Sequence, residues 1–148
     1  MPGVGAPLVA ALGGVTNEAL AAIRRNSEAA GGGAGHAPVT AALHSELREL
    51  VRAASGALNA IGVGHPALDE VSAAFAPLGL ATKLTGAGGG GCALTLLGQE
   101  DDTRAGVLAT VIESLKARGF DVFETSLGGE GVMLLDEGPR VQTGWQVG

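Results

Sequence analysis

The spacing of apolar residues near the amino terminus predicts a long helix. Apolar side chains recur there every three or four residues, which is the period of one helix face, at Leu8, Leu12, Val15, Ala19 and Ile23. Gly13 and Gly14 interrupt this pattern, so regular helix is expected in earnest only from about Thr16. The sequence therefore predicts a helix within residues 8–30, followed by a flexible glycine-rich connector at 31–35.

Two further helices are predicted between residues 40 and 79. Thr40 is suited to cap the first, and Gly62 is suited to end it in the left-handed conformation. The second is expected to begin at Pro66 and to end at Gly79. Their apolar faces are formed by Leu43, Leu47, Leu50, Val51, Ala54, Leu58 and Ile61 in the first, and by Leu68, Val71, Phe75 and Leu78 in the second.

The period then changes to that of strands. Residues 80–85 and 92–97 are short and β-prone, and they flank a run of glycines. A helix is predicted over 103–118, with its inward face at Val107, Leu108, Val111, Ile112 and Leu115. Two more strands are predicted at 120–126 and 131–136. This order predicts an α+β domain in which helices cover one face of a mostly antiparallel sheet.

Composition and charge narrow the functional classes. The 148 residues suit one domain, and 26 of them are glycine. Fifteen acidic against nine basic residues give a net charge of -6, which argues against a general nucleic-acid binder. The single cysteine, Cys92, excludes an intramolecular disulfide framework and fits a cytoplasmic chain. No signal peptide or membrane span is expected, because the first basic residue is Arg24 and no sufficiently long uncharged apolar run is found.

The glycine run at 86–91 has four readings from its residues alone. A Walker A loop is excluded because Gly91 is followed by Cys92 and Ala93 instead of the required lysine and hydroxyl residue. A dinucleotide fingerprint is rejected because a strand follows, where a helix is needed, and Val111 stands near the place of the acidic residue. A flexible hairpin tip and a backbone cradle for phosphate or substrate oxygens both stay open.

The residues around this run resemble a known family. The segment Lys83-Leu84-Thr85-Gly86-Ala87-Gly88-Gly89-Gly90-Gly91-Cys92 resembles the third signature motif of the GHMP kinases, and within them the mevalonate kinase family most closely. Residues 59–69 (Asn-Ala-Ile-Gly-Val-Gly-His-Pro-Ala-Leu-Asp) resemble the helix-break-helix segment that precedes the motif, and residues 120–132 resemble the family's closing hairpin. The resemblance covers about residues 40–135.

The resemblance implies a ferredoxin-like C-terminal domain, here residues 1–148, whose family transfers the ATP γ-phosphoryl group to mevalonate with Mg²⁺ in isoprenoid and sterol synthesis. The family's main phosphate loop and its catalytic Asp and Lys belong to an N-terminal domain that has no match in this sequence. No catalytic or metal residue is therefore assigned, and the chain alone is expected to be an inactive fragment that binds no ATP or Mg²⁺ tightly. The family also has a strand upstream of the first helix, whose absence would leave a bare sheet edge, so a homodimer is a candidate assembly.

The expected site is the loop of Thr85, Gly86, Ala87, Gly88, Gly89, Gly90 and Gly91, which by resemblance lines the cleft beside phosphates and substrate. Thr85 either donates its hydroxyl or is an ordinary strand residue, and Lys83 on its strand is expected to point away. Cys92 is expected to be a small buried hydrophobe, and His65 to cap the next helix. No metal site is expected at His36 or His44, because neither has a partner at metal-ligand spacing. Asp101 and Asp102 are expected to cap the helix that follows them. Glu124 and Ser126 are expected to form a polar face on their strand.

Two alternatives remain. One is the corresponding domain of a relative that phosphorylates another small alcohol, such as phosphomevalonate or homoserine. The other is a non-catalytic ligand-binding or interaction module with the same core. Self-association through a bare sheet edge would favour a truncated enzyme, and a folded monomer that binds a metabolite without ATP turnover would favour the module.

Overall fold

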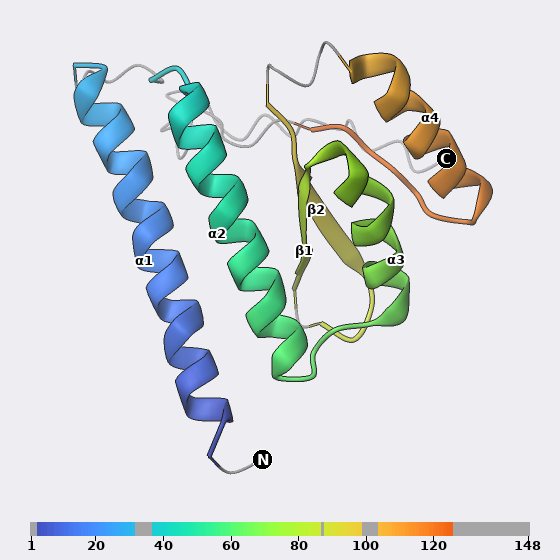
Figure 1. The fold of residues 1–148 in the computed structure, drawn as a ribbon, viewed down its shortest axis with the longest axis horizontal. Coiled ribbons are helices and arrows are strands. Elements are labelled where there is room, and N and C mark those ends of the chain that lie inside the picture. Colours follow the sequence, from blue (N-terminus) through green and yellow to red (C-terminus); the bar gives the residue numbers. More distant parts are fainter. Residues whose placement is uncertain (1–2, 32–36, 87, 99–103, 126–148) are drawn as a thin grey trace, which may run out of the picture.

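The computed structural model describes residues 3–31, 37–86, 88–98 and 104–125 (Figure 1). Its helices and strands follow in the order α1 (Gly5–Ala29), α2 (Ala41–Ala60), α3 (Pro66–Phe75), a 3-10 turn η1 (Ala76–Leu78), β1 (Ala81–Thr85), β2 (Cys92–Leu96) and α4 (Ala105–Ala117). Helices α1 and α2 run side by side, and the β1–β2 hairpin lies between α2 and the pair α3 and α4 (Figure 1). The α+β class predicted from the sequence is confirmed.

Helix α1 differs from its sequence prediction in its start and its buried face. It begins at Gly5 and continues through Gly13 and Gly14, because the cost of two glycines is spread over a 25-residue helix that packs along α2. Ala22 is the buried residue of its carboxyl-terminal half, at 2% exposure, whereas Ile23 is 48% exposed. The prediction that Ile23 faces the core is therefore wrong by one position, or about 100° around the helix.

The same helix is long and apolar enough to cross a membrane by length and composition. Its 18-residue window has a mean hydropathy of 1.4 and is 6% buried. No such segment was predicted from the sequence, because it has no uncharged apolar run of that length; the helix is apolar overall although it contains Glu18. A signal sequence or a core helix can have the same length and composition, so this property alone does not assign a membrane role.

The turn between α1 and α2 is held by polar side chains. Thr40 Oγ1 accepts a hydrogen bond from Leu43 N at 3.2 Å, which confirms Thr40 as the cap of α2. The Thr40 hydroxyl also donates to Asn26 Oδ1 at 2.8 Å, while Asn26 Nδ2 donates to Pro38 O at 3.0 Å. Arg25 and Glu46 form an exposed ion pair across the two helices at 2.7 Å. These contacts fix the end of α1 against the start of α2.

The predicted boundaries of α3 are close to those observed. Gly62 has a φ of +85°, as expected for the residue that ends α2, and Pro66 is the first residue of α3. His65 caps α3, because its Nδ1 accepts a hydrogen bond from Ala67 N at 3.2 Å. Gly79, with a φ of +72°, closes the turn η1 that follows. The chain then enters β1.

Strands β1 and β2 form an antiparallel hairpin whose register runs from Ala81 opposite Leu96 to Thr85 opposite Cys92. Strand β1 is the more buried, because α2 and α3 both pack against it. Thr82 is 5% exposed, and its hydroxyl is satisfied by the Thr95 hydroxyl directly opposite at 2.8 Å. This contact holds the hairpin near the end opposite the glycine loop, which leaves the strands at Thr85 and Cys92.

Helix α4 closes the apolar core. Leu115 is fully buried and packs with Phe75 and Leu80, and Leu108, Val111 and Ile112 pack around this cluster as predicted. Val107 was predicted to face inward but is 53% exposed, since its position lies about 80° around the helix from Leu115. The predicted start at 103 and the predicted cap residues Asp101 and Asp102 lie outside the described residues, and the helix itself begins at Ala105.

The segment after α4 differs from its prediction. Residues 120–125 contain no strand, although 120–126 was predicted as one. Phe120 N donates to Leu115 O at 3.1 Å at the end of α4, and the side chains of Phe120 and Val122 pack against the core. The segment is thus held by side-chain packing instead of a strand ladder. Ser126 and the second predicted strand, 131–136, lie outside the described residues.

Candidate functional site

The glycine loop joins β1 to β2 at the lower end of the hairpin in Figure 1. Its described glycines all have positive φ angles: +84° at Gly86, +81° at Gly88, +73° at Gly89, +123° at Gly90 and +89° at Gly91. L-residues rarely adopt this region, so the backbone path itself requires glycine. Ala87, the remaining non-glycine position of the run, lies outside the described residues.

The loop is docked onto the connection between α2 and α3. Gly89 N donates to Val63 O at 2.9 Å. A Cβ at Gly88 would lie 2.5 Å from Val63 O and 2.8 Å from Val63 Cβ, a separation that real side chains do not reach. The run is therefore fixed against Val63 by a hydrogen bond and by close backbone approach, which favours a built site over a free hairpin tip.

The α2–α3 connection is itself tightly packed. A Cβ at Gly64 would lie 2.5 Å from Asn59 Oδ1. The same Asn59 side chain donates from Nδ2 to Asp69 Oδ1 at 3.2 Å, which ties the end of α2 to the first turn of α3. His65 caps α3 and also borders the loop, because a Cβ at Gly90 would lie 3.8 Å from its Cδ2. The glycine loop therefore packs against a connection that is itself held in place by these contacts.

The loop leaves backbone donors for a ligand. Among the described residues, the N–H of Gly89 is used by Val63, whereas no protein acceptor takes the N–H of Gly88 or Gly90. Successive glycine N–H groups without side chains form concave sites for anions such as phosphate oxygens. Thr85, at the start of the loop, is exposed and brings a hydroxyl to the same edge. This arrangement can hold an anion but contributes no positive side chain.

Lys83 lies apart from the loop, as predicted. Its Nζ donates to Leu84 O at 2.7 Å. The side chain lines a shallow pocket between α2, α3 and β1 together with Ser55, Asn59, Leu68, Asp69, Ser72, Thr82 and Leu84. Lys83 is therefore placed beside Asn59 and Asp69, on the helix side of the hairpin.

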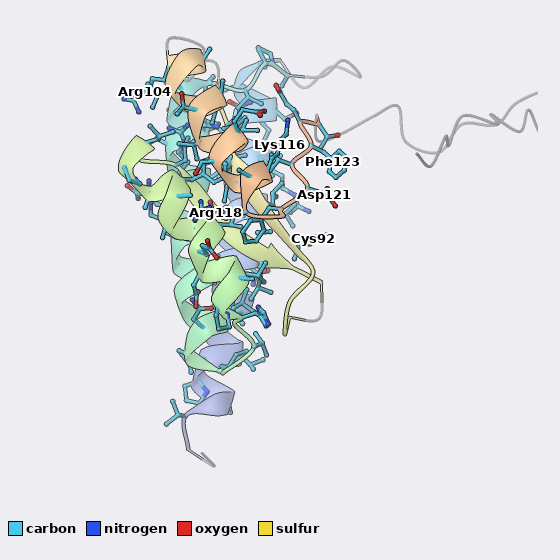
Figure 2. All side chains as sticks on the ribbon, turned by 90° about the vertical axis from the view of Figure 1, so that its right-hand side faces the viewer. Cys92, Arg104, Lys116, Arg118, Asp121 and Phe123 are labelled. Atoms are coloured by element: carbon cyan, nitrogen blue, oxygen red, sulfur yellow. The ribbon has the colours of Figure 1, made fainter. Side chains whose placement is uncertain are left out.

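Cys92 contradicts its prediction. It is exposed at the start of β2, where the strand leaves the loop and the helices do not cover it (Figure 2).

The remaining polar candidates lie away from the loop or outside the described residues. Glu124 is exposed, consistent with the predicted polar face of its segment. His44 is 5% exposed, and its Nε2 lies 2.6 Å from Leu97 O, so it joins α2 to the end of β2. His36 lies outside the described residues.

No group of three or more potential metal ligands occurs among the described residues. The sequence analysis did not single out Val63, Asn59 or Asp69 as site residues. The one available signal was the pair of glycines around Val63, which predicts close backbone approach but does not say to what.

Comparison with known proteins places this arrangement in a family. Residues 57–119 match the family model described as GHMP kinases C terminal. Over 90 residues the chain is 49% identical to the mevalonate kinase of Candida albicans, covering 60% of this chain and 20% of that protein. It is 49% identical over 86 residues to the mevalonate kinase of Bos taurus (58% and 21%) and 42% identical over 88 residues to that of Homo sapiens (60% and 22%). The chain thus matches about a fifth of the length of these relatives.

The matched region holds the elements described above. It starts in α2, contains the α2–α3 connection, both strands and the glycine loop, and ends at Gly119 after α4. The hairpin, the docked loop, α3 and α4 therefore all lie within the matched region. Residues 57–119 of this chain are thus similar to the C-terminal domain of GHMP kinases.

Proposed function

We propose that this chain is the C-terminal part of a mevalonate kinase, an enzyme that transfers the ATP γ-phosphoryl group to mevalonate in isoprenoid and sterol biosynthesis. The observation that carries the proposal is the identity of 42–49% over 86–90 residues to proteins named mevalonate kinase. The GHMP kinase family match at residues 57–119, which includes the docked glycine loop, supports it. In this proposal residues 1–148 are one C-terminal domain, and the enzyme is cytoplasmic.

The proposed site is the loop of Thr85, Gly86, Ala87, Gly88, Gly89, Gly90 and Gly91. Its docking onto Val63 supports a fixed backbone surface, and the unused N–H groups of Gly88 and Gly90 suit phosphate or substrate oxygens. When bound, ATP with Mg²⁺ supplies the phosphoryl group and the charge neutralisation. The role of this chain is to orient those groups by backbone hydrogen bonds and to exclude water beside them.

The chain alone is proposed to be inactive. Phosphoryl transfer depends on positioning and on positive charge around the γ-phosphate. The nearest cation in sequence, Lys83, is occupied at Leu84 O beside the helices, away from the loop. No catalytic residue is assigned here, and the catalytic Asp and Lys, like the main phosphate loop, are proposed to come from an N-terminal kinase domain that docks against this one.

The test is complementation. The chain is mixed with the separately purified N-terminal domain of a mevalonate kinase, and mevalonate-dependent ADP release is measured with Mg·ATP. We expect release from the mixture and none from either part alone. Gly88→Val should abolish it, because the added side chain collides with Val63, whereas Gly106→Ala in α4, where a Cβ meets nothing within 4 Å, should leave it unchanged.

The alcohol that accepts the phosphoryl group is identified in the same assay. Phosphomevalonate and homoserine are supplied in place of mevalonate, and release with either one but not with mevalonate would reassign the domain to another GHMP small-molecule kinase. Turnover by the chain alone that is lost in Gly88→Val would contradict the proposal that the catalytic charges lie elsewhere. A folded chain that binds mevalonate but supports no turnover in any mixture would favour a non-catalytic binding module.

A further inference from the structure

His65 lies where the α2–α3 connection, the first turn of α3 and the glycine loop meet, at the lower end of the molecule in Figure 1. Its side chain is half-buried. One of the two ring nitrogens caps the helix, because Nδ1 accepts a hydrogen bond from Ala67 N at 3.2 Å. The cap holds the ring in one orientation, so the position of the second nitrogen is set by the fold as well.

The cap also determines which nitrogen carries the ring hydrogen. A nitrogen that accepts a hydrogen bond bears no hydrogen, so in the neutral ring of His65 the hydrogen is on Nε2. In the part of the chain that the structure describes, no acceptor takes this Nε2–H. A half-buried donor without a protein acceptor is satisfied by water or by a ligand.

The edge of the ring that bears Nε2 borders the glycine loop. A Cβ at Gly90 would lie 3.8 Å from Cδ2 of His65 and 3.9 Å from its Cγ. Cδ2 is bonded to Nε2, whereas the capping Nδ1 is on the other side of the ring. The backbone N–H of Gly90 also lacks an acceptor among the described residues. A side-chain donor and a backbone donor, both unused, are therefore found at the same border.

The absence of a side chain at position 90 keeps this border open. A Cβ there would be in ordinary van der Waals contact with the imidazole ring, so it would occupy the space beside the Cδ2–Nε2 edge. The φ of +123° at Gly90 disfavours any other residue in addition. An atom of a ligand can thus approach the ring from the loop side.

The chemistry of the border favours an anion. The unused groups of His65, Gly88 and Gly90 are all donors, and phosphate offers several acceptor oxygens to such a set. The positive end of the α3 dipole lies at the same place, because His65 is the N-cap of that helix. The nearby carboxylate of Asp69 accepts a hydrogen bond from Asn59 Nδ2 at 3.2 Å.

We propose that His65 Nε2–H donates a hydrogen bond to a phosphate oxygen held at the glycine loop, together with the backbone N–H groups of Gly88 and Gly90. This inference rests on the proposed function for the identity of the ligand, which is there the triphosphate of ATP. His65 then has two roles that use different nitrogens: Nδ1 caps α3, and Nε2 binds the ligand.

Two substitutions separate the ligand donor from the cap. In His65→Asn the side-chain oxygen lies near the place of Nδ1 and can still cap α3, but no group replaces Nε2. In His65→Gln the amide nitrogen reaches about the place of Nε2, whereas the cap is lost. The urea midpoint should therefore stay close to that of the wild type in His65→Asn and fall in His65→Gln.

Inorganic triphosphate is the probe, because it carries the phosphate chemistry without the nucleoside. The ¹⁵N-labelled chain is titrated with sodium triphosphate, and NMR follows the amides of Gly88 and Gly90 and the ring nitrogens of His65. We expect all three residues to shift with one dissociation constant. His65→Asn should raise this constant about 10-fold, the effect of one hydrogen bond to a charged group, and His65→Gln should raise it much less. Gly106→Ala in α4 should leave it unchanged.

Several results would overturn the proposal. Weaker binding in His65→Gln but not in His65→Asn would show that His65 acts through the cap alone. Triphosphate that shifts the two glycine amides but not His65 Nε2, or that shifts none of the three, would exclude the hydrogen bond to phosphate. A shift of His65 Nε2 with mevalonate but not with triphosphate would assign the donor to a carboxylate.

The complementation assay separates this inference from the proposed function. In the mixture with the N-terminal domain, His65→Asn should raise the KM for Mg·ATP and leave the KM for mevalonate unchanged. A raised KM for mevalonate alone would contradict the assignment to phosphate. Triphosphate binding that depends on His65, in a chain that supports no turnover in any mixture, would uphold the phosphate site and reject the kinase.

Discussion

Gly89 donates its backbone N–H to the carbonyl oxygen of Val63 at 2.9 Å, and so joins the glycine loop to the α2–α3 connection 26 residues earlier in the chain. The hydrogen bond is possible because Gly88 next to it has no side chain and approaches Val63 closely. A loop of residues with unusual backbone angles is thereby held by a second segment whose own shape depends on Gly64.

The first prediction concerns that close approach. Gly88→Ala should lower the free energy of unfolding by about 1–3 kcal/mol, because the new Cβ overlaps Val63 and the positive φ strains an L-residue. Urea unfolding followed by circular dichroism measures the change. Gly106→Ala serves as control, since it adds a methyl group in open space on α4 and should leave the unfolding free energy equal or slightly higher.

The second prediction couples Gly64 to Asn59. Gly64→Ala should displace the Asn59 side chain, whose Oδ1 lies 2.5 Å from the new Cβ, and break its hydrogen bond to Asp69. The cost should be about 1–2 kcal/mol.

A double-mutant cycle checks this mechanism. In an Asn59→Ala background the obstacle is gone, so Gly64→Ala should cost little further stability. Additive losses in the double variant would show that the strain at Gly64 lies elsewhere.

The third prediction concerns the turn between α1 and α2. Thr40→Ala removes the cap of α2 and the hydrogen bond to Asn26, so it should cost about 1–2 kcal/mol in thermal or urea unfolding. Thr110→Ala is the matched control. Its hydroxyl bonds back to Gly106 O within α4 and is exposed, so its removal should change stability little. Equal losses from both variants would contradict a capping role for Thr40.

The fourth prediction tests the core. Leu115 is fully buried against Phe75 and Leu80, so Leu115→Ala should cost about 2–5 kcal/mol. Val107→Ala on the exposed side of the same helix should cost far less. Because Phe120 N bonds to Leu115 O, native-state hydrogen exchange at Phe120 should also accelerate in Leu115→Ala. An unchanged unfolding free energy would show that α4 does not close the core.

Local signals were read correctly where they act within a few residues. Thr40, His65, Pro66, Gly62 and Gly79 each begin or end an element as predicted, because caps and left-handed glycines work through neighbouring backbone groups. The two strands of the hairpin also followed from the β-prone runs on either side of the glycines. The resemblance to the GHMP kinases was confirmed over residues 57–119, which contain two of its three segments, 59–69 and 83–92.

Predictions failed where a neighbour distant in sequence decides the outcome. Cys92 is apolar enough for a core, but its place at the end of the hairpin leaves it exposed. Residues 120–125 have strand propensity, yet a strand needs a neighbouring backbone, and here the segment is held by Phe120 and Val122 in the core. Ile23 and Val107 fit their apolar stripes but lie one position from the buried face.

The sequence by itself determined the order and type of the main elements, the glycine positions and the family resemblance. Each of these depends on short-range propensity or on a pattern of identities along the chain. Only the tertiary structure decided that the glycine loop rests on Val63, that Asn59 and Asp69 meet beside it, and that Ala22 and not Ile23 is buried on α1. The physical reason is that apolar spacing predicts which side chains share a face, whereas burial of that face depends on which distant segment packs against it.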